Sequence, residues 1–208
     1  MPRINVFRSL GLFAANGFLS EAECAQYEHS IRCSTLEAAA VRREGIEERI
    51  EPSRRKVAVA GVDRALTTHL QERLMRLKQP LENHFGFALT GCETPQFLSY
   101  KQGDFYVPHS DSTDDSDAPA YVKQRSVSVV IFLSTPSDEF PSATYGGGAL
   151  TFYGLIKEKD FTLCGLPLEP EAGLLVAFPS HIIHEVRPVT HGERHTIVSW
   201  FYSIRNTA

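Results

Sequence analysis

The chain has 208 residues and a formal net charge of −4, and 42% of its residues are hydrophobic and 22% charged. This length suffices for one domain with a substantial core, and the composition is ordinary for a globular protein. The small negative charge and the absence of a basic run exclude nucleic acid as the main partner. No stretch approaches the roughly 20 apolar residues of a membrane span, so no membrane partner is expected.

The cysteines and the N-terminus bear on localisation. Four cysteines are scattered without a C-x-x-C spacing: Cys24, Cys33, Cys92 and Cys164. This pattern is typical of reduced thiols inside a cell. The apolar run over 10–19 is interrupted by Asn16 and Gly17, and no cleavage-site pattern follows it. We therefore expect a mature N-terminus and a cytoplasmic protein.

The first 92 residues predict helices. Ser20 followed by Glu23 is a capping box, and apolar residues recur behind it at helical spacing, which predicts a helix over about 20–33. A second helix, over about 63–84, is predicted by one leucine stripe: Leu66, Leu70, Leu74, Leu77 and Leu81. Pro80 should end or kink it, because proline removes a backbone donor and clashes with the preceding turn. The charged stretch 41–56 has no clear period and is expected to be exposed.

After Gly91, short β-rich runs alternate with turns, a pattern typical of a sandwich or barrel. The expected strands are 96–101, 104–109, 126–133, 149–153, 173–178, 182–188 and 194–203. Two stretches, 111–120 and 134–148, are expected as loops. Helices in front and strands behind predict a single α+β domain over 1–208, with helical support from 1–92 and a β core over 93–208.

Three residues in the β-rich part predict a metal site. His109 and Asp111 are two apart, so in extended backbone their side chains leave the same face. Two imidazoles and one carboxylate suit non-haem Fe(II), since they occupy one face of an octahedral ion and leave other positions open. His181 and His184 compete as the third ligand, and on a strand they point to opposite faces. We favour His184, ten residues before Arg194.

Arg194 and Thr196 again share a strand face. A guanidinium binds a carboxylate through a two-pronged, charge-assisted hydrogen bond, and the threonine hydroxyl adds one more donor. This pair therefore predicts a carboxylate-binding site for a diacid such as 2-oxoglutarate. Taken alone, Arg194 also suits a salt bridge on an edge strand.

Other polar and aromatic residues admit two interpretations. Arg125 opens a strand and either reaches a substrate at the mouth of the site or forms a structural salt bridge. Tyr106 either lines the pocket or packs in the core. The aspartates of the loop over 111–120 lack the glycine and terminal glutamate of an EF-hand, so a solvated loop beside the site is expected there.

From about residue 95 to 202 the chain resembles the catalytic domain of prolyl 4-hydroxylases, within the Fe(II)/2-oxoglutarate oxygenases. The resemblance begins at "YKQGDFYVPHSD" and continues through "RSVSVVIFL", "GGGALTFYG", "PEAGLLVAFPS" and "HEVRPVTHGERHTIVSWF". Several motifs in order are more specific than any one of them. One departure is that many members have lysine where this chain has Arg194.

The resemblance implies a double-stranded β-helix, or jelly roll, braced by the N-terminal helices. It implies that His109, Asp111 and His184 are the iron ligands, that Arg194 binds the 5-carboxylate of 2-oxoglutarate and that Tyr100 supports it. The implied cofactors are Fe(II), 2-oxoglutarate and O2, and a need for ascorbate is left open. The implied activity is hydroxylation of an unactivated C–H bond of a peptide, an amino acid or a small molecule.

Two other functions remain open at the level of sequence. One is a non-catalytic β-sandwich that binds metal or 2-oxoglutarate as a sensor. The other is a zinc hydrolase, because two histidines and an aspartate also suit Zn²⁺. That alternative leaves Arg194 without a role. The oligomeric state is not indicated by the sequence.

Overall fold

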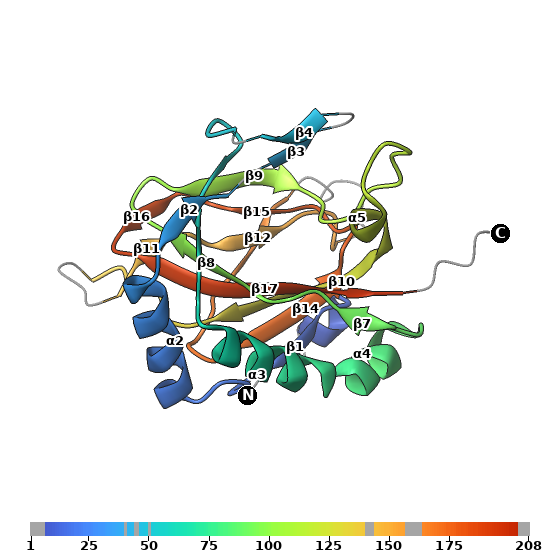
Figure 1. Cartoon of the computed structure of the whole chain (residues 1–208), viewed down its shortest axis with the longest axis horizontal. Coiled ribbons are helices and arrows are strands. Elements are labelled where there is room, and N and C mark those ends of the chain that lie inside the picture. The colour runs from blue at the N-terminus through green and yellow to red at the C-terminus, as the bar shows by residue number, and fades with distance from the viewer. Residues whose placement is uncertain are drawn as a thin grey trace.

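Two antiparallel sheets face one another, and helices cover the outer face of the larger sheet (Figure 1). The computed structural model describes residues 7–39, 41–43, 46–49, 51–139, 144–156 and 164–203, and it describes side chains in these ranges except over 40–50. Parts of the expected exposed stretch 41–56 and of the expected loop 134–148 therefore lie outside the described residues. None of the described helices is long and apolar enough to cross a membrane.

The larger sheet has eight strands. In spatial order they are β1 (Phe13–Ala15), β14 (Leu175–Pro179), β10 (Arg125–Phe132), β17 (Arg194–Tyr202), β8 (Gln96–Tyr100), β6 (Ala58–Ala60) and β2 (Leu36–Ala38), with β7 (Gly91–Cys92) also pairing with β17. Every pair is antiparallel. The longest strand, β17, lies near the middle of this sheet. One of its faces therefore packs toward the helices and the other toward the smaller sheet.

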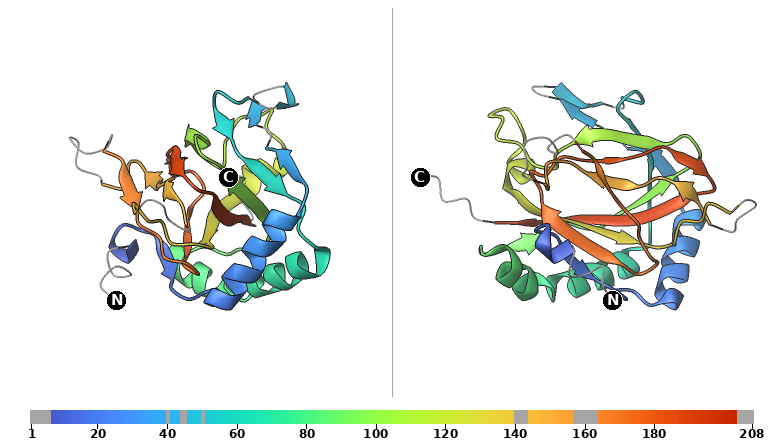
Figure 2. Two further views of the ribbon diagram at one scale, coloured as in Figure 1. Left: turned by 90° about the vertical axis from the view of Figure 1, so that its left-hand side faces the viewer. Right: turned by 180° about the vertical axis from the view of Figure 1, so that it is seen from behind.

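The smaller sheet has five strands. In order they are β13 (Leu166–Leu168), β12 (Leu150–Phe152), β15 (His184–Val186), β9 (Phe105–His109) and β5 (Arg55–Lys56). Two ribbons complete the β structure: β11 (Gly146–Gly147) with β16 (Val189–His191), and β3 (Val41–Arg43) with β4 (Ile46–Arg49). Figure 2 shows the two sheets stacked, which is the jelly-roll arrangement expected from the sequence.

Four helices are labelled: α2 (Glu21–Cys33), α3 (Arg64–Met75), α4 (Lys78–Phe85) and the short α5 (Ala120–Gln124). The capping box at α2 is confirmed, because Ser20 and Glu23 exchange hydrogen bonds between side chain and backbone. The expected second helix is divided between α3 and α4 at Arg76 and Leu77. Arg76 lies four residues before Pro80. In a helix, a proline ring clashes with the carbonyl group of the residue four positions before it, so the break falls where that clash is expected.

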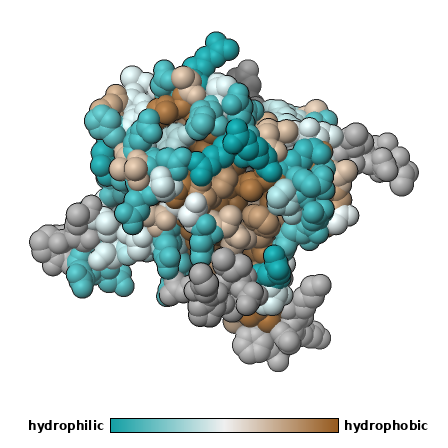
Figure 3. Space-filling view, turned by 90° about the horizontal axis from the view of Figure 1, so that it is seen from below, coloured by the Kyte–Doolittle hydropathy of each residue, from teal (hydrophilic) through white to brown (hydrophobic). Residues whose placement is uncertain are grey.

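Two apolar cores lie on the two faces of the larger sheet. The outer core joins alternate strand residues such as Val129 and Ile197 to Leu70, Leu74 and the other buried leucines of α3 and α4. The inner core lies between the sheets and includes large side chains from both: Tyr100, Phe132, Phe178 and Trp200 from one, Leu150, Phe152 and Val186 from the other. Seen from the helical side, Figure 3 shows an apolar hollow framed by hydrophilic side chains.

The seven strands expected after Gly91 are all present, with ends shifted by a few residues. The front of the chain contributes more than helices, since β1, β2 and β6 extend the larger sheet and β5 the smaller one. These strands have only two or three residues each, too few for an alternating pattern to stand out in sequence.

Candidate metal centre

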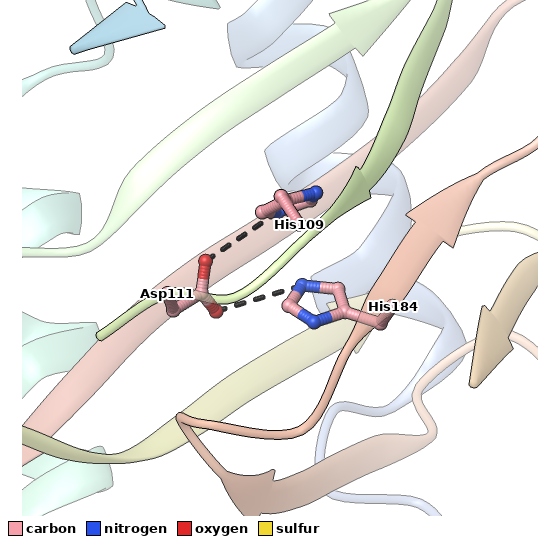
Figure 4. Close-up of side chains that lie close together, drawn as sticks. All are labelled: His109, Asp111 and His184. Carbon is pink, nitrogen blue, oxygen red and sulfur yellow. Dashed lines mark ion pairs between the residues drawn. The ribbon is translucent and has the colours of Figure 1, made fainter. Parts of the chain in front are cut away.

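Three side chains that commonly bind metals converge at one end of the smaller sheet (Figure 4). His109 ends β9, Asp111 follows it by two residues, and His184 begins β15 directly opposite His109 in the antiparallel register. Their ligand atoms all lie within 4.8 Å of one another. Asp111 Oδ1 is 3.5 Å from Nε2 of His109, and Oδ2 is 3.6 Å from Nε2 of His184. The strand pair β9 and β15, together with the second residue after β9, thus supplies the whole donor set.

Backbone carbonyls fix which nitrogen each imidazole presents. Nδ1 of His109 lies 2.9 Å from the Val107 carbonyl, and Nδ1 of His184 lies 3.0 Å from the Ile182 carbonyl. A carbonyl oxygen only accepts hydrogen bonds, so Nδ1 carries the proton and donates in both rings. Each Nε2 is left with a free lone pair facing Asp111, the tautomer that a metal-binding histidine needs.

The charges of the three groups also suit a divalent cation. Burial lowers the pKa of His184 to about 4, so this imidazole is neutral at pH 7. Burial alone would raise the pKa of Asp111, but His184, His109 and the Ser128 hydroxyl hold it well below its usual range. A carboxylate that stays ionised beside neutral imidazole nitrogen is the donor set expected for Fe(II) or another first-row metal.

Aromatic rings restrain both histidines. Tyr106 stacks on His109 with the ring centroids 3.5 Å apart and the planes 15° apart. Phe178 meets His184 edge to face at a centroid distance of 4.8 Å. Tyr106 packs against the inner core, one of the two interpretations that its sequence position allowed, and it also stacks on a candidate metal ligand. That it lines a pocket stays a prediction.

Arg194 lies on the inner face of β17, where only 1% of its surface is exposed. Its guanidinium donates to the Thr196 hydroxyl at 3.3 Å, and its Cζ lies 5.1 Å from the centroid of the Tyr100 ring and 5.5 Å from that of Phe132. Its Nε has no hydrogen-bond partner, and no described carboxylate lies within 4 Å of it. A buried cation without a nearby counter-charge is costly, so a guanidinium that faces no carboxylate of the described residues suits the binding of an anionic ligand.

Two further residues shape the Arg194 pocket and were not anticipated from the sequence. Tyr145 is 1% exposed and forms a side-chain hydrogen bond with Arg194; burial is the main cause that raises the pKa of this phenol. Gly148, with φ of +61°, lets the backbone pass close by, since a Cβ there would lie 2.7 Å from Cδ of Arg194. Both lie within the stretch expected as a loop.

Arg125 forms a salt bridge at the mouth of the β core. Its Nε and a terminal nitrogen reach the two carboxylate oxygens of Glu93 at 2.5 and 2.7 Å, and its Cζ lies 3.7 Å from the centroid of the Trp200 ring. A cavity of about 260 Å³ is lined there by Phe85, Phe87, Ser112, Arg125, Ser126, Pro179, His181 and Ser203. Arg125 thus forms the salt bridge of its second sequence interpretation, and it also borders a cavity that Ser112, the neighbour of Asp111, helps to line. That it contacts a substrate stays a prediction.

The other residues considered at this end lie apart from the three ligand candidates. His181 is exposed, whereas His184 is buried. Within the part of the chain that the structure describes, His109, Asp111 and His184 form the one group of three or more side chains placed to hold a metal ion. Asp114 and Asp117, in the loop that follows, are exposed and do not join it.

Comparison with known proteins agrees with this geometry. A sequence model of the 2OG-Fe(II) oxygenase superfamily matches residues 95–202, which is just over half of the chain. The chain therefore belongs to the 2OG-Fe(II) oxygenase superfamily, the family that the motifs resemble. The metal, co-substrate and oxidant of this family are Fe(II), 2-oxoglutarate and O2.

Relatives with curated descriptions are bacterial. A PKHD-type hydroxylase of Shewanella sp. (strain ANA-3) is 32% identical over 110 residues, covering 53% of this chain and 43% of the relative. A PKHD-type hydroxylase of Nitrobacter winogradskyi is 32% identical over 142 residues, covering 67% of this chain and 55% of the relative. The chain thus spans about half the length of the curated relatives that it matches.

Solved structures share the fold at lower sequence identity. A Pseudomonas putida prolyl-4-hydroxylase superimposes with a TM-score of 0.66 at 22% identity, covering 97% of each chain. A Trichoplax adhaerens prolyl hydroxylase, solved with a peptide fragment of the hypoxia inducible factor oxygen degradation domain, gives 0.71 at 20% identity, covering 96% of this chain and 86% of that one. At these identities the likeness establishes the fold alone.

Proposed function

We propose that this chain is an Fe(II)- and 2-oxoglutarate-dependent dioxygenase that hydroxylates an unactivated C–H bond. The observation that carries the proposal is the buried Arg194, which has no carboxylate of the described residues within 4 Å and lies on the same inner layer as the His109–Asp111–His184 cluster. A metal site alone suits several chemistries. A metal site beside a buried carboxylate receptor suits a metal-chelating 2-oxo diacid.

Each candidate residue has a definite task in this proposal. His109, Asp111 and His184 would hold Fe(II) through the two Nε2 atoms and the carboxylate. Arg194 would bind the far carboxylate of 2-oxoglutarate, with Thr196 and Tyr145 as neighbouring hydroxyl groups and the Tyr100 ring against the guanidinium. The bound metal, with 2-oxoglutarate and O2, supplies the oxidant that inserts one oxygen atom into the substrate and leaves succinate and CO2.

The chain itself positions the reactants and excludes water. Both imidazoles are held in one tautomer by carbonyls, and Arg194 lies within the apolar inner core, so its charge is poorly screened. A rigid, dry receptor orients the co-substrate without reorganisation during turnover. The protein's contribution is therefore orientation and electrostatics rather than the oxidation itself.

The substrate that we propose is peptidyl or amino-acid-like, with a prolyl residue as the first candidate. The support is the resemblance of the motifs to prolyl 4-hydroxylases and the fold shared with a prolyl hydroxylase solved with a peptide. Arg125, Trp200 and the cavity beside Asp111 are the candidate substrate contacts. We also propose that the whole chain forms one catalytic domain.

The decisive test is anaerobic titration of the Fe(II)-loaded protein with 2-oxoglutarate, following the visible charge-transfer band of a chelated oxo acid. The band should appear, and it should be lost in Asp111→Ala. Iron binding without the band would favour a sensor or a hydrolase instead. Proline-rich peptides and free proline should then be compared as stimulants of 2-oxoglutarate consumption, and failure of every peptide would overturn the peptidyl substrate.

A matched pair of histidine variants tests the ligand assignment. His184→Ala should abolish Fe(II) binding because it removes a buried donor, whereas His181→Ala should retain it because that ring is exposed. Equilibrium dialysis with iron analysis measures both. The reverse pattern would assign the third ligand to His181.

A further inference from the structure

Asp111 is held by a buried hydroxyl as well as by its position after β9. The Ser128 hydroxyl donates to Oδ2 of Asp111 at 2.6 Å, and Ser128 is 1% exposed. Ser128 lies on the inner face of β10, opposite Phe178 on one neighbouring strand and Trp200 on the other. In such apolar surroundings a hydrogen bond to a carboxylate is strong and well directed.

A second serine lies against the first. Oγ of Ser180 lies 3.0 Å from Oγ of Ser128, and Ser180 has no exposed surface. The Ser128 hydroxyl is the donor in both of its contacts, and its one proton favours the carboxylate of Asp111, which is the nearer and stronger acceptor. Ser180 therefore packs against the hydroxyl that binds Asp111.

The backbone of Ser180 holds the same aspartate from the other side. Its carbonyl accepts hydrogen bonds from the amides of Asp111 at 2.9 Å and of Ser112 at 3.2 Å, and its own amide donates to the Ser126 carbonyl at 3.0 Å. Ser180 lies between the end of β14 and His184 at the start of β15. It therefore ties β10, the residues after β9 and the segment leading to His184 to one another.

We propose that Ser128 and Ser180 are positioning residues that fix the carboxylate of Asp111 for metal binding. This role rests on the proposed function, in which Asp111 is a metal ligand. The Ser128 hydroxyl and the Ser180 carbonyl hold the side chain and the amide of Asp111 before the metal arrives, so binding costs less ordering of the side chain. The hydroxyl of Ser128 also occupies Oδ2 with a donor and so distinguishes the two carboxylate oxygens.

Isosteric variants at Ser128 separate this role from packing. Ser128→Thr and Ser128→Val have the same shape and differ in one hydroxyl, while Ser128→Ala serves where the larger side chains do not fit. Co(II) binding to the metal-free protein, followed by visible absorption and calorimetry, reports on the site without turnover. Loss of a partner of a metal ligand typically weakens metal binding about 10- to 100-fold.

We expect Ser128→Val and Ser128→Ala to bind Co(II) about 10- to 100-fold more weakly than the unsubstituted protein, and Ser128→Thr to stay within about 3-fold of it. Ser180→Ala should give a smaller loss, since Ser128 would still reach Asp111. The control is Ser199→Ala, because Ser199 is equally buried but donates to the Glu93 carbonyl on the other face of the sheet. It should bind Co(II) normally even if its melting temperature falls.

Two results would overturn the role in distinguishable ways. Equal Co(II) affinity and equal absorption spectra for Ser128→Thr and Ser128→Val would overturn the positioning role alone. Absence of Co(II) binding by the unsubstituted protein would overturn the proposed function, and the positioning role with it.

Discussion

Two consecutive residues of β17, Arg194 and His195, have basic side chains with opposite surroundings. Arg194 faces the inner layer, is always charged, and has no described carboxylate within 4 Å. His195 faces the helical layer, where Glu28 lies 3.3 Å from its Nδ1 and Glu193 lies 3.7 Å from its Nε2. Both side chains are about 1% exposed.

The difference distinguishes a surface built for stability from one built for a ligand. On the helical side the fold supplies its own counter-charges, so the polar groups there complete the structure. On the inner side no carboxylate of the described residues lies within 4 Å of the buried charge of Arg194, which suits the binding of an external anion. Substitutions on the two faces should therefore separate stability from binding.

The largest expected effect is on stability, at the outer face. Ile197→Ala removes a fully buried side chain of the outer core and should lower the free energy of unfolding by about 2–5 kcal/mol. Its affinity for 2-oxoglutarate should stay within about 2-fold, because the Ile197 side chain lies in the outer core, on the face of β17 opposite to Arg194. Urea unfolding and co-substrate titration measure the two effects. A large loss of affinity in the folded variant would break the separation between faces.

Arg194→Gln should have the opposite profile. We expect 2-oxoglutarate to bind at least about 100-fold more weakly, close to 2.7 kcal/mol, with iron binding unchanged. Because the substitution removes a buried charge that lacks a counter-charge, the ligand-free variant should unfold no more easily than the original protein. Titration calorimetry and urea unfolding test both expectations.

Arg194→Lys is the matched control, and it should retain part of the affinity because it keeps the charge but not the two-pronged geometry. Should Arg194→Gln lose stability and iron binding together, Arg194 would be a structural residue and the comparison with His195 would fail.

Tyr145→Phe should have a smaller effect on the same pocket. Arg194 donates to the phenol oxygen, which leaves the hydroxyl proton available to an anion held by the arginine. Losing one hydrogen bond to a charged group should weaken 2-oxoglutarate binding about 10-fold, or about 1.4 kcal/mol. Tyr153→Phe is the control, since that phenol donates to Glu185 on the smaller sheet. Equal effects of the two variants would remove Tyr145 from the site.

The sequence predicted elements whose signals are local. The capping box at Ser20, the leucine stripe of α3 and α4 and the alternating strands after Gly91 each depend on residues close together in the chain. The short strands β2 and β6 were missed because they depend on pairing along the edge of a sheet. The division of the second helix was expected from Pro80, but its exact place depends on which carbonyl the ring displaces.

The site followed the same rule. His109 and Asp111 stand out by their spacing, and Arg194 and Thr196 by sharing a strand face. Tyr145 lies in a stretch without a pattern, so nothing in the sequence relates it to Arg194. Ser128 is concealed for another reason: a serine in an alternating strand suggests a solvent-facing side, but here both faces of β10 are covered. Only the packing of two sheets turns it toward Asp111.

The smallest expected effect returns to His195 and its partner on α2. Burial opposes ionisation of Glu28, but the hydrogen bond and charge of His195 outweigh it and lower the pKa of Glu28 below 4.5. A carboxyl whose pKa is lowered by folding stabilises the protein above its unfolded pKa, and this contribution is lost as the pH falls through the folded pKa. Glu28→Gln should therefore cost about 1 kcal/mol at pH 7.

The pH dependence provides the sharper test of this pair. The difference in unfolding free energy between Glu28→Gln and the original protein should narrow below pH 4.5, because the protonated acid resembles the amide. Glu37→Gln, at an exposed glutamate of β2, should leave the unfolding free energy at pH 7 nearly unchanged. The affinity of Glu28→Gln for 2-oxoglutarate should be unchanged, since Glu28 acts on the helical face. If that affinity fell with stability, the two faces of β17 would be coupled, and the position of the Arg194 side chain would depend on the outer layer.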